Sequence, residues 1–310
     1  MYKLMKQNIS EDAEAQKIAP ARDAERSSTE PGRDRETVRK QKQQKALAPI
    51  GVFDSGAGGL TILSALRREL PQENFIYMGD TFHCPYGTRS EAEIIELTLQ
   101  ANRFLIEQGV KLIVIACNTA SQAALNTLRA TFDIPFIGVI PAVKPAARAT
   151  KRGRIGVAAT NQTVKAAYLR QLIDDFAEGI EVYAIGCPEL VTLVEKGELE
   201  GQRVEETLRH ALRPLLSKEI DVLVLGCTHF PALRPAIEKV VGNKIQVIDS
   251  GTAIARRTHS ILDTEGLMHP YPEEHEAGEL TVFCSGDATT FSQVASKILG
   301  YSVIAHHIEF

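Results

Sequence analysis

The sequence predicts an α/β protein of two pseudo-symmetric domains, each a mainly parallel sheet flanked by helices, with the active site in the cleft between them. Apolar, β-branched segments alternate with helix-like segments along the chain, which is typical of parallel sheets with helices on both faces. In each half, one such apolar segment ends in a cysteine, Cys117 in KLIVIACNTASQAAL and Cys227 in DVLVLGCTHFPALRP. The repeated pattern indicates two similar halves that each bring a thiol to a shared site.

Short apolar segments bounded by turn residues indicate the strands, and apolar residues at three- and four-residue spacing indicate the helices. In the first half, the predicted strands are Ile50–Phe53, Asn74–Met78, Leu112–Ile115 and Phe136–Val139. The predicted helices follow the glycine-rich turn DSGAGG as far as Leu70, span Ser90–Gln108, and span Ala120–Phe132 with Asn118 or Thr119 as the cap.

A proline-bearing segment, Pro141–Pro145, leads to a second half with the same alternation. The predicted strands there are Arg154–Ala158, Glu181–Ile185, Asp221–Leu225 and Ile245–Ile248. Thr228 with Pro231 is expected to start the helix that follows Cys227 and runs through Val241.

Both cysteines are thus predicted to lie at the carboxyl end of a buried strand, the edge where open α/β sheets bind ligands. Each also precedes a helix, whose positive end favours an anion, so we expect either thiol to have a lowered pKa. Two thiols on opposite sides of one substrate can remove a proton from one face of a carbon and return one to the other. The pattern therefore favours racemisation over the alternative of two buried structural cysteines.

Composition indicates an ordinary globular enzyme. The other cysteines, Cys84, Cys187 and Cys284, lack CxxC or Cys/His spacing, so we expect no metal site and no disulfide. The formal net charge is −4, which gives no sign of a nucleic-acid surface. We expect no membrane partner, because no apolar run is long enough for a span, and the absence of a signal stretch favours a cytoplasmic location.

Residues 1–46 differ from the rest of the chain in composition. Lys, Arg, Glu, Gln and Asp dominate there, and aromatic and branched aliphatic residues are nearly absent. Such a segment cannot bury enough apolar surface to offset its ordering entropy. We therefore predict a disordered or marginally helical arm, acting either as a solvated extension or as a regulatory tail, before a body that begins near Leu47.

The turn DSGAGG lacks both the G-x-G-x-x-G spacing and a Walker lysine, which argues against nucleotide binding. We interpret its small residues as allowing backbone amides to approach a substrate carboxylate. Asp54 is expected to project into the cleft, with an Asx-turn or a helix cap as the alternative. His229 is placed to modulate the protonation of Cys227, with an ordinary hydrogen-bonded loop histidine as the alternative.

The motifs FDSGAGGL, GDT with PYGTRS, ACNTAS, LGCTHFP and DSGTAIARR, in this order, resemble those of glutamate racemases in the aspartate/glutamate racemase superfamily. The resemblance extends from about Ile50 to the C-terminus. It implies a cofactor-independent isomerase that interconverts L- and D-glutamate and supplies D-glutamate for peptidoglycan synthesis. It also implies that a second domain, residues 141–249, is inserted into a first domain made of residues 47–140 and 250–310.

The resemblance further implies roles for individual residues. Cys117 and Cys227 match the catalytic acid/base cysteines, which act on the D- and the L-enantiomer respectively. Asp54, His229 and Glu195 match the groups that support them, although Glu195 has an exposed helix charge as its alternative. The matching substrate-binding positions are Asp54, Ser55, Pro85, Tyr86, Gly87, Asn118, Thr119, Thr160, Thr228 and His229. With no pyridoxal cofactor, preorganised neutral donors must stabilise the carbanion.

Two departures from the family pattern stand near the site. Phe82, His83 and Cys84 follow the GDT motif where many relatives have a small residue, and we expect them to reshape one edge of the pocket. Gln162 stands where glycine is common in relatives, beside Thr160 and Thr163.

The sequence leaves several alternatives open. A related aspartate or hydantoin racemase would keep both cysteines, although the PYG and THF surroundings favour glutamate. An additional partner-binding role, such as gyrase inhibition, would use an outer surface or the arm. Some N-terminally extended relatives respond to a UDP-linked cell-wall precursor, so such activation is a hypothesis for this chain, and its oligomeric state is either monomer or homodimer.

Overall fold

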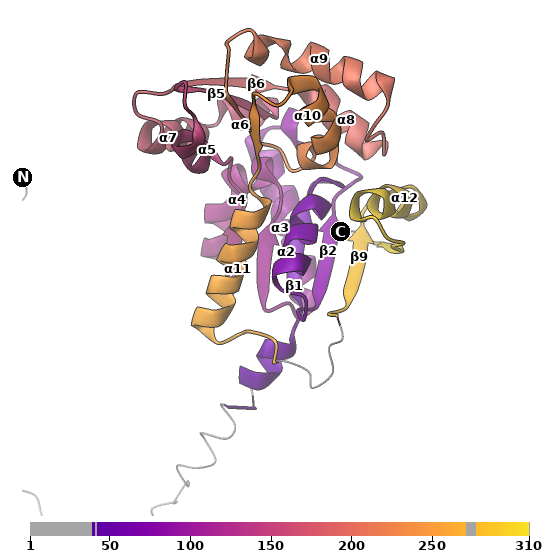
Figure 1. Ribbon diagram of the computed structural model, residues 1–310. Coiled ribbons are helices and arrows are strands. Elements are labelled where there is room, and N and C mark those ends of the chain that lie inside the picture. The colour runs from indigo at the N-terminus through magenta and orange to yellow at the C-terminus, as the bar shows by residue number, and fades with distance from the viewer. Residues whose placement is uncertain (1–38, 41, 271–276, 310) are drawn as a thin grey trace, which may run out of the picture. The chain divides into compact units, whose positions relative to one another are not determined.

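The computed structural model of the protein describes residues 39–40, 42–270 and 277–309 (Figure 1). One sheet contains β1 (Ile50–Asp54), β2 (Phe75–Gly79), β3 (Leu112–Ile115), β4 (Phe136–Gly138), β9 (Leu280–Cys284) and β10 (Ala305–His307). The other sheet contains β5 (Arg154–Ala159), β6 (Glu181–Gly186), β7 (Val222–Leu225) and β8 (Gln246–Ile248). The strand orders are β10-β9-β2-β1-β3-β4 and β6-β5-β7-β8. All of these strands pair in parallel, as the sequence predicted.

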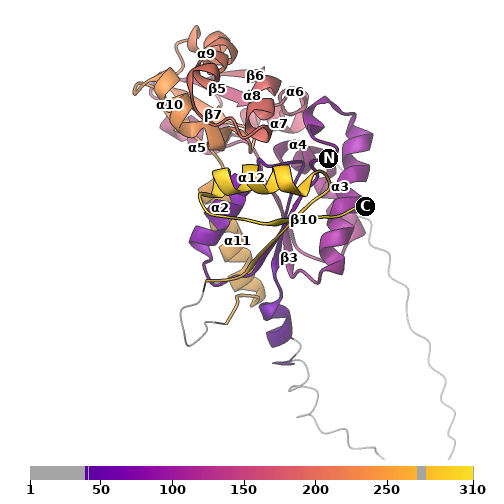
Figure 2. The ribbon, with the colours of Figure 1, turned by 90° about the vertical axis from the view of Figure 1, so that its right-hand side faces the viewer.

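Helices cover both faces of the first sheet, because its strands bury alternate residues on opposite sides. Leu112 and Val114 of β3 join one apolar cluster, and Ile113 and Ile115 join another. The first cluster lies under α2 (Leu60–Glu69), α11 (Gly251–Glu265) and α12 (Ala288–Leu299), and the second under α3 (Glu91–Glu107) and α4 (Asn118–Thr131). Figure 2 shows α2 and α11 on one side of the strands and α3 on the other.

The second sheet has the same layered arrangement. Leu223 and Leu225 of β7 face one apolar cluster, while Val222 and Val224 face another. The helices that cover the two faces are α8 (Pro188–Glu195), α9 (Gln202–Leu216) and α10 (Arg234–Val241) on one side, and α5 (Val143–Ala149), α6 (Asn161–Lys165) and α7 (Ala167–Phe176) on the other. Each sheet therefore lies between two layers of helices, which confirms the predicted fold class.

The central strands of both sheets share one topological feature. The chain leaves β1 for β2 on one side and later places β3 on the other side of β1. In the same way it leaves β5 for β6 and later places β7 on the other side of β5. The loops at such a switch point diverge and leave a crevice at the carboxyl edge of the sheet. Cys117 and Cys227 each lie two residues beyond the strand across the switch point, β3 and β7 respectively.

The predicted strands agree with the observed ones to within one residue at either end, but two predictions about helix starts were wrong. The segment Pro141–Pro145 leads to the second half, and α5 begins within it at Val143. Neither Asn118 nor Thr119 caps α4; the Cys117 sulfur does so by accepting a hydrogen bond from the Ala120 N–H. The helix after Cys227 does not start at Thr228.

A 3-10 turn, Phe230–Leu233, separates Cys227 from α10, which begins at Arg234. Thr228 does not cap this helix, because it lies six residues before Arg234; its hydroxyl donates to Asp54 instead. A proline in the first turn of α10 fixes a backbone angle suited to the later start. Cys227 therefore lacks the adjacent α-helix N-terminus that the sequence predicted for it.

The N-terminal edge of the described body is anchored to the first sheet. Residues 42–47 are helical, and the buried Ala46 carbonyl accepts a hydrogen bond of 2.6 Å from Lys111 Nζ. Lys111 is itself buried and forms an ion pair with Glu73. Most of the predicted arm, residues 1–38, lies outside the described residues. Within the described part of the chain, no helix is both long and apolar enough to cross a bilayer.

Candidate active site

A pocket between the carboxyl edges of the two sheets contains both thiols. The residues that line it are Ser55, Pro85, Tyr86, Gly87, Cys117, Asn118, Thr119, Thr160, Val191, Cys227, Thr228 and His229. Its free volume is only about 10 Å³, which is roughly the space that one water molecule needs. The structure thus brings together every predicted substrate-binding residue except Asp54 in a closed pocket.

Cys117 lies at the first-sheet side of this pocket. Its sulfur is 3.5 Å from the Ser55 hydroxyl and accepts a hydrogen bond of 3.5 Å from the Ala120 N–H. Burial, with a smaller contribution from the charge of Asp54, raises the pKa of the Cys117 thiol to about 12 despite these two contacts. The predicted lowering of this pKa was therefore wrong, because the loss of water around the sulfur outweighs the helix N-terminus in the closed pocket.

Cys227 lies at the second-sheet side, next to an imidazole and a carboxylate. Its sulfur is 3.6 Å from Nδ1 of His229, and Nε2 of the same ring is 2.5 Å from Oε1 of Glu195. Burial opposes a charged imidazole, but hydrogen bonds with Cys227, Cys84 and Glu195 outweigh it and raise the pKa of His229 well above its ordinary value. These contacts favour the protonated form of the ring, which lies between the Cys227 thiol and the Glu195 carboxylate.

Glu195 ends α8 with its side chain turned into this cluster, and 22% of the side chain is exposed. It is not the freely exposed helix charge that was the alternative. Burial opposes ionisation, but the hydrogen bond and the charge of His229, with a bond from the Ala57 N–H, lower the pKa of Glu195. The Ala57 N–H donates to Oε1 over 2.7 Å. The glycine-rich turn thus binds a protein carboxylate where the sequence suggested a substrate carboxylate.

The glycines of this turn make room for the cluster. A Cβ at Gly56 would lie 2.1 Å from Glu195 Oε1, and a Cβ at Gly58 would lie 2.3 Å from Nδ1 of His229. A side chain at Gly56 would displace Glu195, and one at Gly58 would displace His229, the ring that contacts Cys227. Glycine is therefore needed at positions 56 and 58, because only a residue without a side chain leaves room for Glu195 and His229.

Asp54 lies behind the pocket and is fully buried. Its Oδ1 accepts a hydrogen bond from the Gly56 N–H over 2.8 Å, the Asx-turn that was the alternative, and its Oδ2 accepts one from the Thr228 hydroxyl over 3.0 Å. Burial raises the pKa of Asp54 to about 6, although the charge of His229 opposes this. Asp54 therefore supports the pocket without lining it.

Hydroxyl and amide groups form the remaining wall. The hydroxyls of Thr119 and Thr160 are 3.0 Å apart, and Thr160 also donates to the Thr163 hydroxyl over 3.1 Å. The Asn118 Nδ2 group is buried without a hydrogen-bond partner among the described residues. A buried donor without a partner is unstable unless something satisfies it, so Asn118 is well suited to bind a carboxylate of the substrate.

The PYG segment is fixed from behind by a residue that the sequence did not single out. Asp80, the residue after β2, is fully buried and accepts hydrogen bonds from the Tyr86 hydroxyl over 2.6 Å and the Ser285 hydroxyl over 2.6 Å. Its position directly after β2 is the signal that could have identified it. Val191 of α8 was also missed, since nothing distinguishes it in the sequence from an ordinary core valine.

The residues after the GDT motif were expected to reshape one edge of the pocket, and they do not act together. Phe82 is exposed and lies outside the pocket lining. His83 interacts with Asp80, with its Nδ1 2.9 Å from Oδ1. Cys84 faces Glu195 and His229 instead. Gln162 donates to the Arg89 carbonyl over 2.6 Å and does not line the pocket.

Comparison with known proteins agrees with this arrangement. The Asp/Glu/Hydantoin racemase family matches residues 58–258. The glutamate racemase of Deinococcus radiodurans is 45% identical over 239 residues, which are 76% of this chain and 82% of that protein. A glutamate racemase isoform of Bacillus anthracis has a similar crystal structure, with a TM-score of 0.76, 34% identity, and coverage of 84% of this chain and 97% of that one.

The crystal structure of Escherichia coli glutamate racemase in complex with L-glutamate and the activator UDP-MurNAc-Ala is also similar. Its TM-score is 0.72, with 37% identity and coverage of 81% of this chain and 95% of that one.

Proposed function

This chain belongs to the Asp/Glu/Hydantoin racemase family, and we propose that it interconverts L-glutamate and D-glutamate with Cys117 and Cys227 as the acid/base pair. The observation that carries the proposal is the placement of the thiols. They lie beyond equivalent strands of two parallel sheets, at both switch points, and line one pocket. A group on each side of a bound carbon is what inversion of that carbon requires.

The reaction exchanges one proton for another. One cysteine, as thiolate, takes the α-proton from its face of glutamate, and the other, as thiol, gives its proton to the opposite face. Cys117 deprotonates the D-enantiomer, and Cys227 deprotonates the L-enantiomer. After one turnover the protons have changed places, so the next turnover in the same direction requires exchange with solvent.

The two thiols have different supporting groups. His229, charged and paired with Glu195, lies against Cys227 and stabilises its thiolate electrostatically. Cys117 has Ser55 and the Ala120 N–H, and its pKa is raised in the closed pocket. We propose that the ammonium group of the substrate supplies the positive charge that stabilises the Cys117 thiolate, since this side of the pocket has no cationic side chain among its described lining residues.

Neutral donors stabilise the charge that develops on the carbanion. Ser55, Asn118, Thr119, Thr160 and Thr228 line the pocket, and no arginine or lysine is among its described lining residues. Preorganised hydroxyl and amide donors act strongly in a site without water. They also bind the carboxylates of both enantiomers without favouring either one.

We propose the remaining properties as extensions of this function. The first domain consists of residues 47–140 and 250–310 and the second of residues 141–249, since β9 and β10 pair beside β2 in the first sheet. D-glutamate made in the cytoplasm enters peptidoglycan synthesis. The activator bound by the E. coli enzyme supports activation here by a UDP-linked cell-wall precursor, which rate measurements with and without that precursor test.

The test of the function follows racemisation by circular dichroism. Pure L-glutamate and pure D-glutamate, each with no added cofactor, should both approach the racemic mixture. L-aspartate and a chiral hydantoin, assayed in parallel, separate glutamate racemase from the related alternatives. Faster racemisation of either compound than of glutamate would overturn the proposed substrate.

A further inference from the structure

Three side chains with metal-binding groups meet beside the pocket. Cys84, Glu195 and His229 each offer one ligand atom, and these atoms lie within 4.8 Å of one another. Glu195 and His229 already contact each other, with 2.5 Å between Oε1 and Nε2. The glycine at position 56 leaves the space open, since a Cβ there would lie 2.9 Å from Cys84 Sγ and 2.1 Å from Glu195 Oε1.

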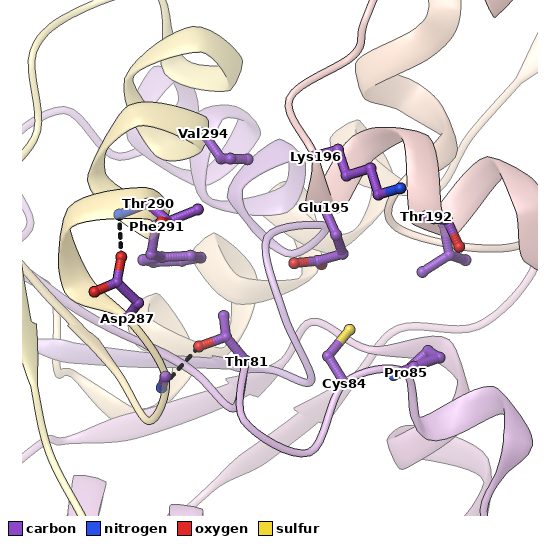
Figure 3. Close-up of a pocket in the computed structure, with 12 residues that line it drawn as sticks. Thr81, Cys84, Pro85, Thr192, Glu195, Lys196, Asp287, Thr290, Phe291 and Val294 are labelled. Carbon is purple, nitrogen blue, oxygen red and sulfur yellow. Dashed lines mark hydrogen bonds between the residues drawn. The ribbon is translucent and has the colours of Figure 1, made fainter.

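A separate cavity gives solvent access to this cluster. It has a volume of about 380 Å³ and is lined by Cys84, Glu195, Thr81, Asp287 and other residues of the loop after β2, α8 and α12. In Figure 3, the sulfur of Cys84 and the carboxylate of Glu195 extend from the loop and from α8 toward the same space. A cation and its remaining water ligands can reach the cluster through this cavity.

We propose that Cys84, Glu195 and His229 form a binding site for zinc(II) that inhibits the enzyme. A thiolate, an imidazole and a carboxylate are the ligands that zinc takes in proteins. Three protein ligands with one open position for water are typical of accessible zinc sites, and the adjacent cavity supplies that water. Magnesium prefers oxygen ligands in an octahedral arrangement, so the cluster favours zinc over magnesium.

Coordination forms bonds from zinc to sulfur, nitrogen and oxygen and involves no change of oxidation state. The Cys84 thiol proton and the imidazolium proton pass to the solvent buffer, because a metal binds the deprotonated forms of both groups. The direct contact between His229 and Glu195 is replaced by two bonds to the cation.

Inhibition follows from which elements the cation joins. Cys84 belongs to the loop after β2 of the first sheet, whereas Glu195 and His229 follow strands of the second sheet. Zinc would link the two sheets across a pocket that must open for substrate exchange, and it would hold the imidazole that supports Cys227. This inhibition rests on the proposed racemase reaction, but the binding of zinc does not.

The experiment measures binding and activity separately on the full chain. Isothermal titration calorimetry with zinc chloride should show one ion per chain, and magnesium chloride should show none. Cobalt(II), as a spectroscopic substitute, should give a thiolate-to-metal charge-transfer band. Cys84→Ala should weaken zinc binding at least about tenfold and abolish the cobalt band, because it removes a direct ligand.

Racemisation is then measured over a zinc titration, with each variant normalised to its own rate in the presence of a chelator. Cys84→Ala should need at least about tenfold more zinc for half-inhibition. Cys284→Ala is the matched control, because it removes a buried cysteine outside the cluster and should keep the wild-type response. Cys84→Ser, which is nearly isosteric, replaces Cys84→Ala if the alanine variant does not fold.

The outcomes divide clearly. Zinc affinity and inhibition that are unchanged in Cys84→Ala would overturn the site, as would an absence of zinc binding by the folded wild-type protein. Loss of binding in Cys227→Ser but not in Cys84→Ala would assign the ion to the catalytic thiols and also overturn it. Binding at Cys84 without inhibition would overturn the inhibitory role, and an inactive but zinc-binding wild-type protein would contradict only the proposed function.

Discussion

The Thr228 hydroxyl donates a hydrogen bond of 3.0 Å to Oδ2 of Asp54, and this bond joins the carboxyl edges of the two sheets. Asp54 ends β1, while Thr228 follows β7 and lines the pocket. The Thr61 hydroxyl reinforces the contact by donating to the Thr228 carbonyl over 2.9 Å. Because Asp54 is fully buried, its protonation state affects the stability of the closed arrangement.

Asp54 should make stability depend on pH. Burial raises its pKa from 3.8 to about 6, so the folded protein holds this proton more tightly than the unfolded chain. Stability from this group is fully present below about pH 4 and is lost as the pH rises through 6, a change of about 3 kcal/mol. Urea unfolding across this range should show a smaller decline for Asp54→Asn than for the wild type. Parallel curves for the two proteins would contradict the raised pKa.

The two thiols should be separable by enantiomer. Cys117→Ser and Cys227→Ser should each lower racemisation at least about a hundredfold, because a serine hydroxyl is a far poorer base than a thiolate. In D₂O, the Cys117 variant should still exchange the α-proton of L-glutamate, and the Cys227 variant that of D-glutamate. Proton NMR measures this exchange. Wild-type-like racemisation by either variant, with an unchanged melting temperature, would remove that cysteine from the mechanism.

Loss of Glu195 should change the pH dependence of catalysis. Glu195→Gln keeps an oxygen for the Ala57 N–H but removes the charge that helps hold His229 protonated. The pKa of His229 should fall, so the alkaline limb of the kcat/KM profile should move to lower pH. Glu200→Gln is the matched control, because Glu200 is exposed and should leave the profile unchanged. An identical profile for both variants would show that Glu195 does not act through His229.

A methyl group at position 58 should impair the imidazole directly. The Cβ of Gly58→Ala would lie 2.3 Å from Nδ1 of His229, so the ring must move away from Cys227. We expect kcat to fall at least about tenfold, since small misplacements of catalytic groups are costly. The rate of exchange from L-glutamate should fall more than that from D-glutamate, because His229 supports Cys227. Equal losses for both enantiomers would point to a general disruption of the pocket.

The residues just before Leu47 should contribute more to the stability of the folded body than their polar composition suggests. A chain that begins at Leu47 loses the Ala46 carbonyl that accepts from buried Lys111. We expect it to be less stable by about 1–3 kcal/mol than a chain that begins at Lys40, because a buried charged donor loses a partner. Calorimetric melting of the two truncated chains measures the difference. Equal melting temperatures would place the start of the body at Leu47, as the composition predicts.

Local sequence patterns determined most of the secondary structure. The strand predicted before Cys117, Leu112–Ile115, has the same limits in the structure. A short run of apolar, mostly β-branched residues is typical of a buried parallel strand. The position of each cysteine beyond its strand also followed from the sequence, since the carboxyl edge of a parallel sheet is fixed by chain direction. The motifs that surround Cys117 and Cys227 indicated the family.

Only the tertiary structure decided how these groups interact. Cys84, Glu195 and His229 are far apart in the chain, and no spacing rule could bring them together. The raised pKa of Cys117 likewise follows from burial by segments that are distant in sequence. The position of a strand can be predicted from the pattern of side chains along its own length. The burial, charge and contacts of an active-site residue depend instead on which separate segments of the chain meet around it. The sequence therefore determined where the thiols stand, and the packing of the two sheets determined what surrounds them.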